Sequence, residues 1–430
     1  MKRILLFLFV VISFTTANAN ETLKEQVDQS ADRIEPKVIE WRRHFHQFPE
    51  LSNREFKTAE KIAEHLKNLG LEVQTSIAHT GVVGLLKSGK PGPVVALRAD
   101  MDALPVTERV DVPFASKVRA EYNGQDVGVM HACGHDTHIA MLMGVAEILS
   151  SMKNDLKGTV KFIFQPAEEG APRGEEGGAR LMVKEGVLEN PKVDVIFGLH
   201  IWSLMEAGTI GYRPGGTMAA SDGLKITVKG KQTHGSTPWT GVDPITVSAQ
   251  IIMGLQTVIS RQTELTEDAA VITIGSIHGG LRSNIIPEQV ELVGTIRTLN
   301  TEMQDKIHEK IRLTVTKIAE SAGAVADVRI SKGCPVTYND PELTAMMLPS
   351  LKEAAGAENV NLINAITGAE DFSFYEQRVP GLFFFLGGMP KNKKPEEAAP
   401  HHSPDFYIDE SALKLGVRAM SYLVLDYMEQ

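Results

Sequence analysis

The sequence predicts an α/β protein whose main sheet is interrupted by a smaller inserted α+β unit. Short apolar runs bounded by turn residues alternate with helical stretches, which is typical of buried strands in an α/β sheet. These runs are GVVGLL, PVVALR, TVKFIF, VDVIFGL and GLFFFLG. The middle of the chain instead shows the order strand, helix, strand, strand, helix, strand, which is that of a split βαβ unit. At 430 residues, the chain is long enough for two or three domains.

The elements can be followed in order along the chain. In EFKTAEKIAEHLKNLG, apolar residues recur at helical spacing and Gly70 is a natural helix stop. The inserted unit starts near Ser221 with the strand GLKITVKG, followed by a helix from Pro244 to Arg261 and the strands AAVITIGSI and QVELVGTIRTL. A helix from Glu302 to Ala322 and the strand ADVRISK complete it, and the main pattern resumes after Asp340.

The first residues predict export. MKRILLFLFVVISFTTANANE begins with basic residues, continues with an apolar run and reaches Ala17-Asn18-Ala19, the pattern of a cleavable signal peptide. The run falls short of the ~20 apolar residues that span a bilayer, so cleavage is favoured over an uncleaved anchor. The mature protein is therefore expected to be periplasmic or secreted. The expected parts are a signal peptide (1–19), a large domain (20–216 and 336–430) and an inserted domain (217–335).

Charge excludes two classes of partner. The net charge is −10 and the isoelectric point is about 5.8. A nucleic-acid binder is expected to carry a basic face, and electrostatic attachment to an anionic membrane needs clustered basic residues. We therefore expect neither nucleic acid nor a membrane as a partner.

Residues that bind metals follow the predicted buried strands. Carboxyl ends of parallel strands meet at one edge of an α/β sheet, which is where such sheets bind ligands. The segment MHACGHDTHIAML, at the start of a predicted helix, supplies further candidates. The candidates that we expect to converge are Asp100, Asp102, Cys133, His135, Glu168, Glu169, His200, His401 and His402.

These residue types predict a metal centre. Thiolate, imidazole and carboxylate together suit Zn²⁺, with Mn²⁺, Co²⁺ or Ni²⁺ as alternatives. More candidate ligands are present than one tetrahedral site with an open position can use, which favours two cations. The neighbours Glu168 and Glu169 are expected to have different roles: one binds a cation, and the other accepts a proton from the attacking water. The motifs HEXXH and G-x-S-x-G, which would indicate other hydrolases, are absent from the sequence.

The two cysteines leave an alternative open. In an exported protein, Cys133 and Cys334 could form a disulfide. Cys334 lies in SKGCPVT with no other ligand-type residue beside it, so the two thiols do not look like a matched pair.

At the level of whole motifs, the chain resembles the N-acyl-amino-acid amidohydrolases, which include hippurate hydrolases, bacterial aminoacylases and plant auxin-conjugate hydrolases. These form a branch of the dinuclear aminoacylase/carboxypeptidase metallopeptidase family. The resemblance implies a mixed-sheet catalytic domain with two metal ions and an inserted ferredoxin-like lid that mediates homodimerisation. The matching segments run in order along the mature chain: RRHFHQFPELSNREFKTAEKIAEHL, ALRADMDALPV, MHACGHDTHIAMLMG, FIFQPAEEG, FGLHIW, GKQTHGSTPWTGVDPI, SNIIPEQVELVGTIRT, GAEDFSFY and HHSPDFYIDESAL.

The resemblance also implies roles for single residues. Glu168 is the expected general base. Asp102 is expected to orient a ligand, Asp100 is left undecided, and His131 and His138 are expected to be structural or supporting. The metal ligands implied by the motifs are Cys133 as the bridge, His135, Glu169, His200 and His402.

In the inserted unit, the resemblance implies three residues that bind substrate. His234 in KQTHGSTP would reach the active site of a partner chain and polarise the scissile carbonyl. Asn284 in SNIIPE and Arg297 in GTIRT would bind the substrate, and an arginine suits its carboxylate.

The expected activity is metal-dependent hydrolysis of the amide bond in N-acyl amino acids. One alternative is a dipeptidase or carboxypeptidase that uses the same two-metal site. A more remote alternative is a non-catalytic periplasmic protein that binds a metal or a ligand.

Overall fold

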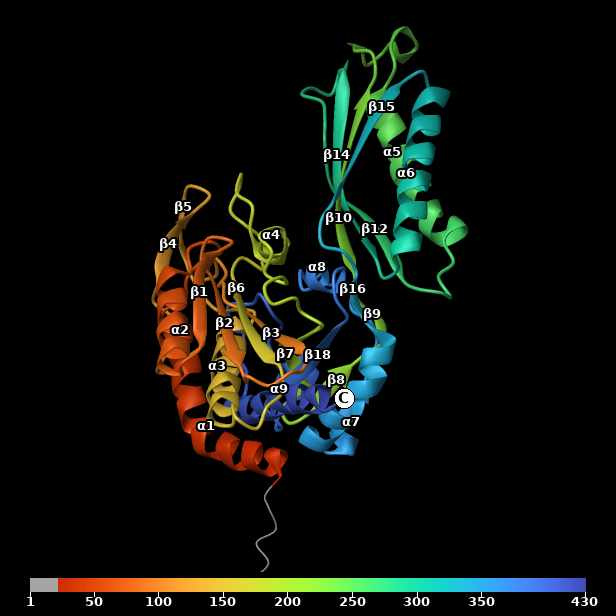
Figure 1. Cartoon of the computed structure of the whole chain (residues 1–430). Helices are drawn as coiled ribbons and strands as arrows, with labels where there is room; N and C mark the ends of the chain where they lie inside the picture. The colour runs from red at the N-terminus through yellow and green to blue at the C-terminus, as the bar shows by residue number, and fades with distance from the viewer. Residues whose placement is uncertain (1–21) are drawn as a thin grey trace, which may run out of the picture.

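A mixed eight-stranded sheet forms the centre of the molecule (Figure 1). The computed structural model describes residues 22–430, so the predicted signal peptide, residues 1–19, lies outside the described residues. Four neighbouring strands, β6, β3, β7 and β18, run parallel. The strands, in sheet order, are β1 (Glu72–Ile77), β2 (Gly81–Lys87), β6 (Thr159–Gln165), β3 (Val94–Asp100), β7 (Val195–Glu206), β18 (Gly381–Met389), β8 (Ile210–Tyr212) and β17 (Val360–Leu362).

Helices cover both faces of this sheet, which is why its strands are continuous apolar runs in the sequence. One apolar core joins one face to five helices: α1 (Leu23–Gln47), α2 (Phe56–Asn68), α3 (His135–Ser151), α7 (Pro341–Ala355) and α9 (Leu413–Met428). A second core on the other face includes residues of the short helices α4 (Gly178–Lys184) and α8 (Ser373–Glu376). The predicted α/β class is confirmed.

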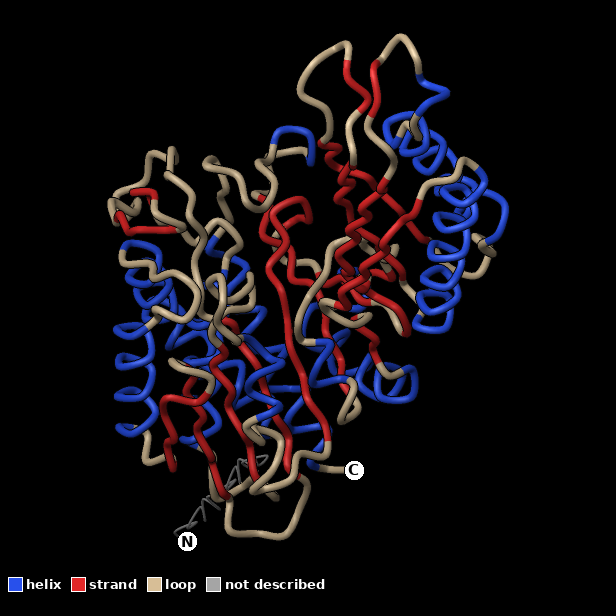
Figure 2. The backbone as a smooth tube through the Cα atoms, turned by 90° about the horizontal axis from the view of Figure 1, so that it is seen from above, coloured by secondary structure: helices blue, strands red, loops and turns tan. Residues whose placement is uncertain are grey.

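A separate sheet with its own apolar core forms the inserted unit, residues 220–332, which projects from the large sheet (Figures 1 and 2). Its four strands are antiparallel in the order β12-β14-β10-β15, and two helices pack on one face. Along the chain the elements are β10 (Ala220–Lys229), α5 (Pro244–Gln262), β12 (Ala270–His278), β14 (Gln289–Thr298), α6 (Thr301–Ser321) and β15 (Val325–Lys332), in the predicted βαββαβ order.

Short two-stranded ribbons complete the structure. One ribbon, formed by β9 and β16, lies where the chain enters and leaves the inserted unit, beside the predicted boundaries at residues 217 and 335. The pairs are β4 (Arg119–Tyr122) with β5 (Gln125–Gly128), β9 (Gly215–Met218) with β16 (Thr337–Asn339), and β11 (Thr233–His234) with β13 (Ile285–Ile286).

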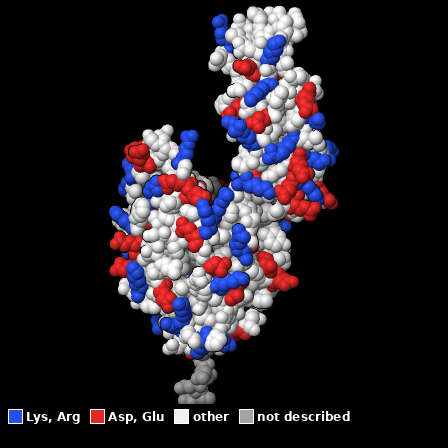
Figure 3. All heavy atoms as spheres, turned by 45° about the horizontal axis from the view of Figure 1, so that its top comes forward, with Lys and Arg blue, Asp and Glu red and all other residues white. Residues whose placement is uncertain are grey.

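The surface carries charges of both signs. On the face in Figure 3, Lys and Arg are interspersed with Asp and Glu rather than collected into one basic area. Within residues 22–430, no helix combines the length and the apolar character needed to cross a membrane.

Candidate metal centre and catalytic pocket

The predicted convergence at one sheet edge is present. Strand β3 ends at Asp100, β6 ends just before Glu168, and the loop after β18 carries His402. His200 differs in one respect, because β7 continues past it to Glu206. Since β3, β6, β7 and β18 are parallel, these side chains lie at the same edge.

Cys133 lies at the centre of the cluster. Its Sγ is 3.4 Å from Nε2 of His200 and 3.3 Å from Nε2 of His402. The next residue, Gly134, has a φ of +91° and turns the chain directly into α3. A Cβ atom there would lie 2.4 Å from Cγ2 of Ile201, so both the conformation and the space require glycine.

His135 presents one ring nitrogen to the site. Its Nδ1 donates a hydrogen bond to the backbone carbonyl of Asp102 at 2.9 Å, which leaves Nε2 unprotonated in the neutral ring. Nε2 lies 3.9 Å from both Oε2 of Glu168 and Oε1 of Glu169. Among the described residues, His135 Nε2 has no hydrogen-bond partner although it is buried, and the buried Oε1 of Glu169 opposite it lies 3.1 Å from Nε2 of His402. An unpaired buried nitrogen that faces carboxylate oxygens is what a bound cation would satisfy.

The local field favours positive charge. Burial by itself lowers the pKa of the His135 imidazole, but Asp100 and Asp102 together raise it to about 10. Burial, with Glu169 and Glu168 adding to it, raises the pKa of the Cys133 thiol well above its usual range. The carboxylates around His135 and Cys133 make the site negative, so a cation would be attracted to it and would favour the thiolate and the neutral imidazole.

The donor atoms fit two cation positions that share ligands. The atoms of each of two groups lie within 4.8 Å of one another: Cys133, Glu169 and His402 form one group, and His135, Glu168 and Glu169 form another. His200 joins Cys133 in a further group. All five residues predicted as ligands therefore lie in one cluster, with Glu168 at its edge.

Asp100 and His138 lie beside the cluster and, with His135, form a further group of donor atoms within 4.8 Å of one another, but they are hydrogen-bonded to each other. His138 Nε2 accepts a hydrogen bond from the Ile201 N–H at 2.9 Å, so its Nδ1 donates to Asp100 Oδ1 at 2.6 Å. His131 is buried, and burial lowers the pKa of its imidazole to about 4, so the ring is neutral. The supporting roles expected for both histidines stay predictions.

Asp102 holds the loop that carries the two glutamates. Its Oδ1 accepts the N–H of Glu168 and its Oδ2 accepts the N–H of Glu169, each at 3.1 Å. Ser52 Oγ donates to the same Oδ2 at 2.7 Å. Asp102 thus holds the backbone of the glutamate loop in addition to the His135 ring, whose Nδ1–H its carbonyl accepts; the resemblance implied only the contact with a ligand.

A buried arginine that we had not singled out organises the carboxylates behind the site. The Arg98 guanidinium donates to Asp100 Oδ2 at 2.7 Å, to Glu370 Oε1 at 2.9 Å and to Asp371 Oδ1 at 3.1 Å. Its Nε donates to the side-chain oxygen of Gln165 at 2.8 Å. The sequence held one sign of a buried charge, because Arg98 interrupts an otherwise apolar strand. Its partners Glu370 and Asp371 could not be identified in the same way, because they are remote along the chain.

Replacing Arg98 with methionine is expected to lower the free energy of unfolding by about 3 kcal/mol, because it strands buried carboxylates without their counter-charge. The matched control is Arg109→Met, which removes an exposed pair with Asp405 and should leave the urea midpoint nearly unchanged. Urea denaturation followed by circular dichroism measures both. Equal midpoints for the two variants would contradict the assignment of Arg98 as the central counter-charge.

His401, which the sequence placed among the converging candidates, lies beside the thiol. Its Nε2 accepts a hydrogen bond from the Ser203 N–H at 3.1 Å, so in the neutral ring the proton is on Nδ1. That Nδ1 lies 3.6 Å from Cys133 Sγ. Burial, with His402 adding to it, lowers the pKa of His401 to about 3. His401 thus faces the thiol as a donor, while Nε2 of its neighbour His402 lies 3.3 Å from the same sulfur and 3.1 Å from Oε1 of Glu169.

A cavity of about 600 Å³ lies over the cluster. The metal-binding residues form one wall, and the sheet of the inserted unit forms another through Arg297 and its neighbours. Trp202 and Met218 add apolar surface. Cys334 also lines the cavity, and neither it nor Cys133 forms a disulfide in the described chain. The predicted substrate-binding position of Arg297 is therefore within reach of the metal cluster.

His234 and Asn284 are not in this cavity. His234 ends β11 and Asn284 directly precedes the partner strand β13, at the other end of the inserted sheet, where the Gly235 N–H donates to the carbonyl of Asn284 at 2.8 Å. Arg297 pairs with Ser221 at the near end of β14, whereas Gln289 starts that strand at the far end. The eight residue steps from Gln289 to Arg297 span about 27 Å along the strand. One chain in this conformation therefore does not bring all three residues together.

A parallel-centred α/β sheet with thiol, imidazole and carboxylate donors gathered at its carboxyl edge places the protein among the metal-dependent hydrolases. The comparisons with known proteins identify the family. The model of peptidase family M20/M25/M40 matches residues 96–426. The chain belongs to this family and is a metal-dependent hydrolase that acts on amide bonds.

Individual relatives cover nearly the whole chain. Thermostable carboxypeptidase 2 of Saccharolobus solfataricus is 41% identical over 94% of this chain and 99% of its own length. N-acetyl-L-cysteine deacetylase of Bacillus subtilis is 35% identical over 93% of this chain and 90% of its own. A solved structure from Bacillus subtilis, described as a dinuclear metal-binding peptidase from the M20 family, is 35% identical with a TM-score of 0.77, covering 93% of this chain and 99% of that one.

Proposed function

We propose that the protein hydrolyses the amide bond of N-acyl amino acids and releases a carboxylic acid and a free amino acid. The observation that carries this proposal is that Arg297 and the cluster of Cys133, His200 and His402 line the same cavity. Glu168 lines it too, with metal ligands on one side and Glu370 on the other. An anion-binding arginine opposite an amide-cleaving centre suits a substrate that has a carboxylate near its scissile amide.

Two divalent cations, Zn²⁺ or Mn²⁺ with Co²⁺ or Ni²⁺ as alternatives, would activate water and polarise the scissile carbonyl when bound by Cys133, His135, Glu169, His200 and His402. The unpaired Nε2 of His135 and the position of Glu169 Oε1 between it and His402 support their assignment as ligands.

Glu168 performs the proton transfers. Its carboxyl lines the cavity and its backbone is fixed by Asp102, so it is held beside the position of the attacking water. It takes the proton of that water and then gives it to the leaving nitrogen, which departs as the amine of the amino acid. Arg297 binds the carboxylate of the same amino acid, and apolar surface from Trp202 and Met218 remains for the substrate's hydrophobic parts.

The alternative within the class is a dipeptidase or carboxypeptidase, which the name of the Saccharolobus relative keeps open. An activity screen decides between them. Purified protein receives Zn²⁺, Mn²⁺ or Co²⁺ and is incubated with N-acetyl and N-benzoyl amino acids, dipeptides, and N-acyl amines that lack the carboxylate. We expect release of amine from the N-acyl amino acids and little from the carboxylate-free amines. Preference for dipeptides would overturn the proposal in favour of the peptidase.

We also propose that the enzyme works as a homodimer in which His234 serves the site of the partner chain. The support is the separation of His234 from the cavity of its own chain. Glu168→Gln and His234→Ala proteins, each inactive alone, should regain about a quarter of wild-type activity when dissociated and mixed, because half of the dimers then hold one intact site. A monomer by sedimentation, or mixtures that stay inactive, would contradict shared sites.

For location, we propose a periplasmic or secreted protein with residues 1–19 removed, on the strength of the N-terminal pattern alone. N-terminal sequencing of protein recovered from the producing cell tests this, and an intact Met1 would overturn it.

A further inference from the structure

The turn that carries the two catalytic glutamates is held from outside by two buried carboxylates. This turn, residues 166–169, has the sequence Pro-Ala-Glu-Glu. The Ala167 N–H donates to Oε1 of Glu55 at 3.0 Å. The N–H groups of Glu168 and Glu169 donate to the two oxygens of Asp102. Three successive backbone N–H groups of the turn thus donate to carboxylates from other segments of the chain.

The turn needs this support because its backbone is strained. Ala167 has a φ of +52°, in the left-handed region that a residue with a Cβ atom seldom adopts. Such a conformation costs about 1–3 kcal/mol and persists only where surrounding contacts enforce it. Ala167 immediately precedes Glu168, so relaxation of its backbone would re-aim the Glu168 side chain.

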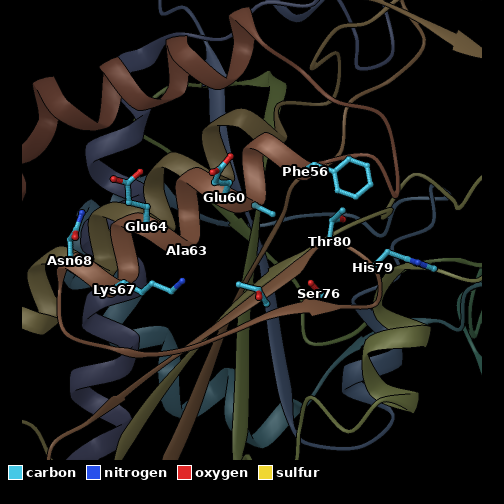
Figure 4. Close-up of a pocket in the computed structure, with 11 residues that line it drawn as sticks. Phe56, Glu60, Ala63, Glu64, Lys67, Asn68, Ser76, His79 and Thr80 are labelled. Carbon is cyan, nitrogen blue, oxygen red and sulfur yellow. The ribbon is translucent and has the colours of Figure 1, made fainter.

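The Glu55 side chain is placed to contact the turn and not to cap its own helix. It occupies the N-cap position of α2, yet its side chain makes no capping bond to that helix. The side chain is fully buried, and Thr80 Oγ1 donates to its second oxygen at 2.5 Å. Thr80 lies on the wall of a cavity of about 540 Å³ between α2 and β1, as the labelled side chains in Figure 4 show. Burial, with Asp102 adding to it, raises the pKa of the Glu55 carboxyl to about 8.

We propose that Glu55 is a positioning residue for Glu168: by accepting the Ala167 N–H, it holds the left-handed turn that aims the base at the substrate. This inference rests on the proposed function, since it takes Glu168 to be the general base. It adds a residue from the α1–α2 connection, remote from the metal ligands in sequence, to the machinery of proton transfer.

The test compares three variants at two neighbouring glutamates. Glu55→Ala leaves the Ala167 N–H without its acceptor, and kcat should fall about 10- to 100-fold with KM nearly unchanged. Glu55→Gln keeps an oxygen for that N–H and should restore kcat to within a few-fold of wild type. Glu50→Ala is the matched control, because Glu50 accepts the N–H groups of Lys57 and Thr58 at the start of the same helix and does not touch the turn.

A second measurement does not depend on activity. Hydrogen exchange, followed by mass spectrometry on the peptide spanning 165–170, should speed up in Glu55→Ala and remain as in wild type in Glu50→Ala and Glu55→Gln. Metal content should be the same in all four proteins. The inference is overturned if Glu55→Ala keeps full kcat, if Glu50→Ala loses as much, or if exchange at the turn does not change.

Two further variants keep the outcomes distinguishable. If Glu55→Ala does not fold, Thr80→Val removes one of the two bonds to the Glu55 carboxyl, and kcat should fall by a few-fold; unchanged kcat and exchange would overturn the inference. Glu168→Gln tests the proposed function separately. An active Glu168→Gln protein refutes the base assignment, whereas an inactive one together with a fully active Glu55→Ala refutes only the role of Glu55.

Discussion

Replacing Cys133 with serine should remove metal and activity together. The Cys133 Sγ lies within 3.4 Å of Nε2 of both His200 and His402 and belongs to two of the candidate donor groups, so we expect it to bridge the two cations. A serine hydroxyl at this position stays protonated and is a much weaker ligand than a thiolate. We expect metal content to fall below about one ion per chain and kcat/KM to fall by about 10²-fold or more. Elemental analysis after gel filtration, paired with the amide-hydrolysis assay, measures both.

The control for this experiment is the other cysteine. Cys334 lines the same cavity but lies outside every candidate metal group found among the described residues. Cys334→Ser should keep its metal and its kcat. If Cys133→Ser retained two ions per chain, the thiol would not be the shared ligand and the assignment of the centre would be wrong.

Replacing Glu168 with glutamine should lower kcat by about 10²–10⁴-fold while both metals stay bound. Glutamine preserves the size of the side chain and the backbone contact with Asp102, but it cannot take a proton from water. The loss should therefore appear in kcat rather than in KM or in metal content. Steady-state kinetics on an N-acyl amino acid, with metal analysis of the same sample, provides the measurement.

A glutamate close by in sequence supplies the comparison. Glu176 is exposed and pairs with Lys184 at 2.6 Å, so Glu176→Gln should leave kcat unchanged. Near-wild-type kcat in Glu168→Gln with metal in place would show that another group accepts the proton.

Much of the architecture was readable from local patterns. Apolar runs of strand length predicted the buried strands because a parallel sheet covered on both faces excludes polar residues from its core. The same argument located the site, since residues such as Asp102 and Glu169 directly follow those runs. The order βαββαβ of the inserted unit also followed from the spacing of apolar residues and from the turn residues, and the structure confirms this order.

Other features depended on contacts between remote segments. Glu55 precedes Ala167 by 112 residues, and Arg98 is separated from Glu370 by 272. No periodicity links such pairs, because a hydrogen bond between two elements leaves no regular spacing in the chain. His401 and His402 are a sharper case: these adjacent histidines face the same sulfur, but His401 also accepts the Ser203 N–H, whereas His402 lies against Glu169.

The sequence alone determined the fold class, the sheet edge that holds the site and the kinds of atoms gathered there, because these follow from local patterns of hydrophobicity and turn residues. The tertiary structure decided which donors remain open, which carboxylates serve the backbone, and that Arg297 lines the cavity while His234 and Asn284 do not. The reason is physical: a residue's chemical type is fixed by its side chain, but its role depends on which of its atoms are already satisfied by neighbours that only folding brings within bonding distance.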